Sequence, residues 1–83
     1  MVDSAIITMM DRSNNTLGDF ELPLKISIKE LKMKLVAMLK AMDSDKYANV
    51  EELTIEHNGK TLDEEETLYH NAVWDGSIIK LSW

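Results

Sequence analysis

The sequence predicts one small α+β domain, in which a mixed sheet of four to five strands packs on one central helix, with a short helical turn. Three observations predict it: apolar residues alternate with polar ones in several short segments, one longer segment has helical spacing, and Asn58-Gly59 marks a tight hairpin. With 83 residues, 45% hydrophobic and 29% charged, the chain has room for one core. We therefore expect a single domain over residues 1–83.

The first two strands are predicted to form an antiparallel hairpin. Residues 5–10 are apolar and rich in β-branched side chains, and the polar residues 11–15 are typical of a loop. Apolar and acidic residues then alternate over residues 18–22, as in a strand with one buried face. Pro23 cannot donate a backbone hydrogen bond, so it marks the end of pairing or an edge position.

The predicted first strand is apolar on both faces. One of Ile6 and Ile7, and one of Met9 and Met10, must therefore point away from the helix, and the pattern leaves open which face is buried. An outward apolar face is either covered by a partner or simply tolerated.

A helix is predicted to begin after Ser27, because Ser27 and Glu30 have the spacing of a capping box. The residues that follow include an apolar stripe at helical spacing, which we expect to face the core. The stripe consists of Ile28, Leu31, Leu35, Met38, Leu39 and Met42. The polar residues 43–45 end the pattern.

The remaining elements are short. Residues 53–57 alternate as a strand, and Asn58-Gly59 is the dipeptide best suited to a type I′ turn, with a return strand over residues 60–62. Thr67 can cap a single helical turn. A last strand is predicted over residues 78–81, after the Asp75-Gly76 turn.

Composition disfavours several classes of function. A net charge of −6 disfavours nucleic-acid binding, and no apolar run is long enough for a membrane span or signal peptide. The chain has no cysteine, and its two histidines, His57 and His70, lack a second ligand at metal spacing. No serine belongs to a nucleophile motif. We expect no catalytic residue, cofactor or metal, and therefore no enzyme.

This order of elements is that of the β-grasp fold, and residues 53–81 resemble the second half of ubiquitin. The likeness includes residues 58–62 at the tight hairpin and Thr67-Leu68 at the helical turn. Ubiquitin and the related sulfur carriers react through a terminal pair of glycines, whereas this sequence stops at Ser82-Trp83. The resemblance therefore implies that the chain forms neither a thioester nor a conjugate.

Among relatives without the diglycine tail, the chain resembles the YukD/EsaB family of type VII (WXG) secretion accessory proteins. The likeness rests on its length and on residues 75–81, an Asp-Gly turn followed by an Ile-Ile-Lys-Leu strand. It implies a cytoplasmic bacterial protein that binds a protein partner, as a monomer or weak homo-oligomer, without inserting into a membrane. A general adaptor domain from a larger protein is the alternative, and a protein modifier or sulfur carrier is disfavoured.

The predicted partner-binding residues come from two sources. The resemblance to ubiquitin implies that Glu56, Lys80 and Ser82 occupy the positions of its apolar recognition patch, so that partners of that patch should not bind here. Met33 falls on the far side of the helix stripe and Trp83 lies at the end of the sequence, and exposed Met and Trp are favoured at interfaces.

Overall fold

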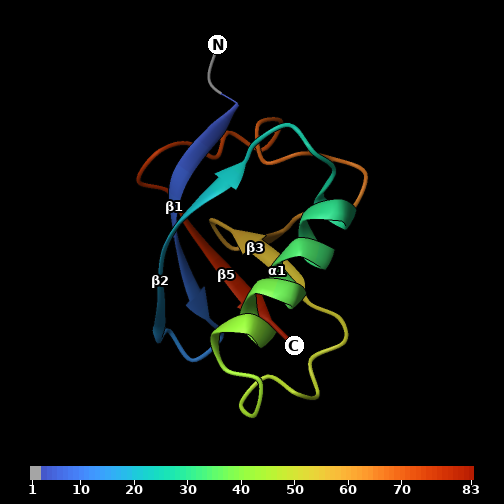
Figure 1. Cartoon of the computed structure of the whole chain (residues 1–83). Coiled ribbons are helices and arrows are strands. Elements are labelled where there is room, and N and C mark those ends of the chain that lie inside the picture. Colours follow the sequence, from blue (N-terminus) through green and yellow to red (C-terminus); the bar gives the residue numbers. More distant parts are fainter. Residues whose placement is uncertain (1–2) are drawn as a thin grey trace.

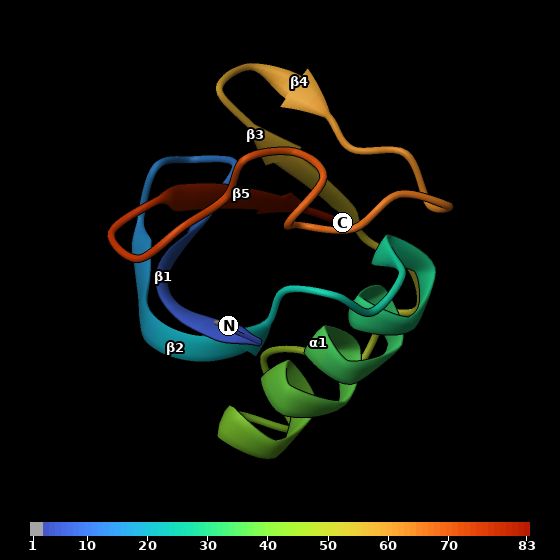
Figure 2. The same ribbon diagram turned by 90° about the horizontal axis from the view of Figure 1, so that it is seen from above.

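A computed structural model describes residues 3–83. It contains one five-stranded mixed sheet with a single helix, α1, packed across one face (Figures 1 and 2). The elements are β1 (Ser4–Asp11), β2 (Thr16–Pro23), α1 (Ile28–Met42), β3 (Thr54–His57), β4 (Lys60–Thr61) and β5 (Ile78–Ser82). The strand order is β2-β1-β5-β3-β4, and only the β1–β5 pair is parallel. The predicted α+β fold class is confirmed.

The β1–β2 hairpin forms as predicted and settles which face of β1 is buried. Alternate residues Ala5, Ile7 and Met9 face α1 and are buried, whereas Ile6 lies on the opposite face with 49% of its surface exposed. Pro23 is the last residue of β2 and pairs with Ser4. Because β2 is an edge strand, the backbone N–H group that Pro23 lacks does not remove a hydrogen bond from the centre of the sheet.

The first turn of α1 is capped by its own sequence and by a distant loop. The Ser27 hydroxyl accepts a hydrogen bond from the Glu30 amide at 3.2 Å, as the capping box predicts. The amides of Ile28 and Lys29 donate to the carbonyls of Glu66 and Glu64, at 2.7 and 3.0 Å. These bonds satisfy amides that have no partner within the helix, so residues 63–67 are fixed against its start.

The apolar stripe of α1 is buried along most of its length. Ile28, Leu31, Leu35 and Leu39 are buried and Met38 is partly buried, as expected. The prediction for Met42 is wrong, because 46% of its surface is exposed. Met42 is the last residue of α1, so its side chain lies beyond the end of the core.

The second half of the chain has the predicted turns. Asn58 and Gly59 both have positive φ, 52° and 79°, which is the requirement of a type I′ turn between β3 and β4. The Thr67 hydroxyl accepts from the His70 amide at 2.9 Å and so caps a single helical turn. Leu68 in this turn is fully buried, so it anchors the turn against the core.

Candidate interaction surfaces

The sheet face opposite α1 brings together three of the predicted partner-binding residues. On β5, Ile79 and Leu81 are buried, so Lys80 and Ser82 point to the outer face. On β3, Ile55 is buried and Glu56 points outward. Glu56 lies directly across from Lys80 in the antiparallel register, which places their side chains side by side.

The outer sheet face is defined here by Glu56, Lys80 and Ser82 with the apolar residues Ile6 and Ile78. Ile78 begins β5 and has 52% of its surface exposed, and it pairs in register with Thr8 two residues beyond Ile6. Among residues 3–83 no ion pair joins Glu56 to Lys80. The face thus offers an acidic group, a basic group and two isoleucines that a partner can cover. Ile78 was not predicted as a partner-binding residue. The sequence did indicate that either Ile78 or Ile79 faces outward, because neighbouring residues of a strand point to opposite faces.

Met33 and Trp83 do not belong to this face. Met33 lies on α1, on the other side of the sheet, and 68% of its surface is exposed. The Trp83 ring meets the buried Tyr47 ring edge to face, with centroids 5.6 Å apart, and Trp83 also lines a small hollow of about 130 Å³ with residues 11–13. The five predicted residues therefore occupy three separate places and do not form one patch.

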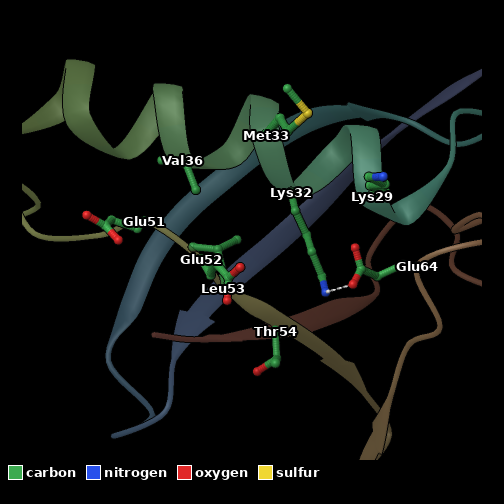
Figure 3. Close-up of a pocket in the computed structure, with 9 residues that line it drawn as sticks. All are labelled: Lys29, Lys32, Met33, Val36, Glu51, Glu52, Leu53, Thr54 and Glu64. Atoms are coloured by element: carbon green, nitrogen blue, oxygen red, sulfur yellow. Dashed lines mark ion pairs between the residues drawn. The ribbon is translucent and has the colours of Figure 1, made fainter.

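A larger groove lies between α1 and the segment that leads into β3 (Figure 3). Its volume is about 700 Å³. The lining residues are Lys29, Lys32, Met33, Val36, Glu51, Glu52, Leu53, Thr54 and Glu64. The Lys32 ammonium group reaches across toward the Glu64 carboxylate, with 3.9 Å between nitrogen and oxygen. Of the predicted partner-binding residues only Met33 lies here.

The loop between β1 and β2 is held by the carboxylate of Asp11. This group accepts hydrogen bonds from the amides of Ser13 and Asn15, at 2.8 and 2.9 Å, and from the Asn15 side chain. The bond from the Asn15 amide is the main reason that the pKa of Asp11 lies below its ordinary value, and Lys46 adds a favourable charge. Asp11 therefore has a structural role in the turn.

Two other kinds of site receive no support from the geometry. In the part of the chain that the structure describes, no three His, Asp or Glu side chains are grouped to hold a metal ion. His70 lies 3.5 Å from the Glu66 carboxylate, one turn away on the surface, which is a common pairing of exposed side chains. Within residues 3–83, no helix has the length and apolar character needed to cross a membrane.

The strand order, the parallel pairing of β1 with β5 and the single helix define a ubiquitin-like β-grasp domain. A family model described as WXG100 protein secretion system (Wss), protein YukD, matches residues 6–81. The chain therefore belongs to the YukD family. Ubiquitin-like domain families are generally non-enzymatic.

Solved structures agree with this fold. The ubiquitin-like domain of the type VII secretion system protein EccD1 of Mycobacterium tuberculosis has a TM-score of 0.75 at 18% identity, with 100% of both chains covered. The EccD5 ubiquitin-like domain of Mycobacterium xenopi also scores 0.75, at 16% identity over 96% of this chain and 93% of that one. Ubiquitin of Caldiarchaeum subterraneum scores 0.67 at 21% identity, over 95% and 91%. Among curated proteins, none matches the chain significantly.

Proposed function

We propose that this chain is a non-conjugated ubiquitin-like module that binds a protein component of a bacterial WXG-type (type VII) secretion system in the cytoplasm. The observation that carries the proposal is the match to the YukD family over residues 6–81. Two EccD ubiquitin-like domains, one of them from a protein named for type VII secretion, share its fold.

The outer sheet face is the surface that we propose for this binding. Glu56 and Lys80 stand side by side at its centre, so a partner must supply a basic and an acidic group to replace the water that it removes from them. Ile6 and Ile78 add apolar area that a partner can bury. A surface complementary to an apolar patch would remove water from Glu56 and Lys80 without replacing it, which favours partners different from those of ubiquitin.

Site-specific cross-linking in native cells tests the proposal. A photoreactive phenylalanine analogue at Lys80 should form an adduct with a secretion-system protein, whereas the same analogue at Lys34, exposed on α1, should not form that adduct. The adduct is identified by mass spectrometry. If Lys80 cross-links only to enzymes of a ubiquitin pathway, or to nothing, the proposed role is wrong.

Non-conjugation has its own test. The three glycines, Gly18, Gly59 and Gly76, are isolated from one another, and none forms the pair that activating enzymes use in ubiquitin. Incubation of the chain with an activating enzyme and ATP should leave its mass unchanged. A covalent adduct would favour the modifier or sulfur-carrier alternative.

An adaptor domain within a larger protein is the second candidate function. It is favoured by the EccD structures, which are named as ubiquitin-like domains of proteins. An antibody against this domain, used on native cell extract, separates the two candidates. A band near 9.5 kDa supports the free module, and a much larger band supports the adaptor.

A further inference from the structure

The groove between α1 and residues 51–54 has an apolar centre. Met33 lies on its upper edge with 68% of its surface exposed, and Val36 points from α1 toward Leu53 on the opposite wall (Figure 3). A volume of about 700 Å³ is within the range of sites that enclose a ligand or several side chains. An apolar side chain placed here would lie against Val36 and Leu53, with Met33, whose side chain points away from that wall, at the rim (Figure 3).

The two ends of the groove carry opposite charges. Lys29 is exposed near the start of α1, while Glu51 and Glu52 are exposed on the far wall, toward the end at which Val36 lies (Figure 3). Lys32 is already paired with Glu64. Within residues 3–83 neither Lys29 nor the two glutamates form an ion pair, so each end is free to bind a group of opposite charge.

The wall formed by residues 51–54 also has unused backbone groups. Glu51 and Glu52 make no backbone hydrogen bond to any other residue of the described chain. The return strand β4 pairs with β3 only at Glu56 and His57, and the Leu62 amide extends this pairing to the Ile55 carbonyl. An extended peptide lying in the groove can therefore hydrogen-bond to Glu51 and Glu52 where β4 does not reach.

We infer that this groove binds an extended segment of a protein partner, with an apolar side chain between an acidic residue that meets Lys29 and a basic residue that meets Glu51 and Glu52. The apolar centre supplies contact area, and the charges at the two ends fix the direction of the peptide. This surface is separate from the outer sheet face, so it adds a second binding site to the proposed module. Either site can be present without the other.

Defined peptides test the inference by NMR titration of the ¹⁵N-labelled chain. The probes are Ac-Asp-Thr-Val-Met-Val-Thr-Lys-NH₂, the same peptide with Asp and Lys exchanged, and two versions with Lys or Asp at both ends. One of the two mixed-charge peptides should bind best and should shift the amide signals of Met33, Val36 and Thr54. The amide signals of Asp19 and Glu21, in the edge strand β2 that is separated from β3 by two strands, should not move.

A change of charge at one end of the groove should change which peptide is preferred. Lys29→Glu should weaken the best mixed-charge peptide about two- to five-fold and strengthen the peptide with Lys at both ends, as expected for one exposed ion pair. Lys34→Glu is the matched control, since it makes the same charge change on α1 outside the groove and should leave the order of affinities unchanged.

Three results would overturn the inference. They are the absence of shifts at Met33, Val36 and Thr54 with every peptide, equal binding of all four peptides, and a change of preference with Lys34→Glu as large as with Lys29→Glu. Met33→Ser adds a check on the apolar rim of the groove. Because Met33 is mostly exposed and lies at the rim, this variant should fold normally and bind the best peptide about two- to three-fold more weakly, which corresponds to a small part of the transfer free energy of one Met side chain.

Discussion

Near the end of α1, two residues of the apolar stripe differ in how deeply they are buried. Leu39 and Met42 both belong to the apolar stripe, but Leu39 is fully buried whereas 46% of the Met42 surface is exposed. Leu39→Ala removes fully buried carbon atoms and should cost ~2–5 kcal/mol of unfolding free energy. Met42→Ala should cost ~1 kcal/mol or less, because about half of a Met side chain is buried and Ala has the higher helix propensity.

Urea denaturation followed by circular dichroism measures both costs. A domain of this length has a total stability of about 4–12 kcal/mol, so Leu39→Ala can consume a large part of it. If that variant does not fold, Leu39→Val gives a smaller cavity and a measurable transition. The comparison is valid when the slope of the transition is the same in all variants. Equal costs for the two Ala variants would refute the packing described here and favour the continuous stripe.

Three further predictions concern the sheet face and the loops. Lys80→Ala should change the unfolding free energy, measured by urea denaturation, by less than ~0.5 kcal/mol. The same variant should recover less of the cross-linked partner in a pull-down. Unchanged recovery would place the binding site elsewhere. Thr67→Ala should cost ~1 kcal/mol in the same assay, because the His70 amide loses its acceptor, and Thr67→Ser should restore most of it. Asp11 has a lowered folded-state pKa, so its stabilising effect is complete above its unfolded value of 3.8 and disappears as the pH falls through the folded value. The stability difference between the wild type and Asp11→Asn should therefore shrink below about pH 4, and a difference independent of pH would exclude this role.

Local signals in the sequence predicted most of the fold. The cap at Ser27, the Asn58-Gly59 turn and the cap at Thr67 each depend on side chains and backbone within a few residues, so the sequence specifies them directly. The exposure of Met42 depends on where the core ends, and the orientation of β1 depends on pairing with β5, about 70 residues away from β1. No local pattern contains that information.

The same limit applies to the candidate sites. Glu56, Lys80 and Ser82 come together because two neighbouring strands present alternate residues to one face, which follows from strand periodicity and the resemblance to ubiquitin. The groove beside α1 could not be predicted, since it is formed by elements that are distant in the sequence and by a segment with no regular structure. Nothing in the sequence distinguishes Glu51 and Glu52 from other acidic residues. Only the fold places them on the wall of the groove that faces α1, the helix that carries Lys29 and Met33.

The central strand of the sheet is also the last one in the sequence. β5 lies between β1 and β3, so the β1–β2 hairpin and the β3–β4 hairpin do not pair with each other. They become one sheet only when β5 pairs with both. During synthesis on a ribosome, residues 78–82 leave the exit tunnel after every other element. Because domains fold as units, the sheet of this domain closes only after translation of the whole segment, and until then the inner edges of both hairpins stay open to chaperones or to pairing with other chains.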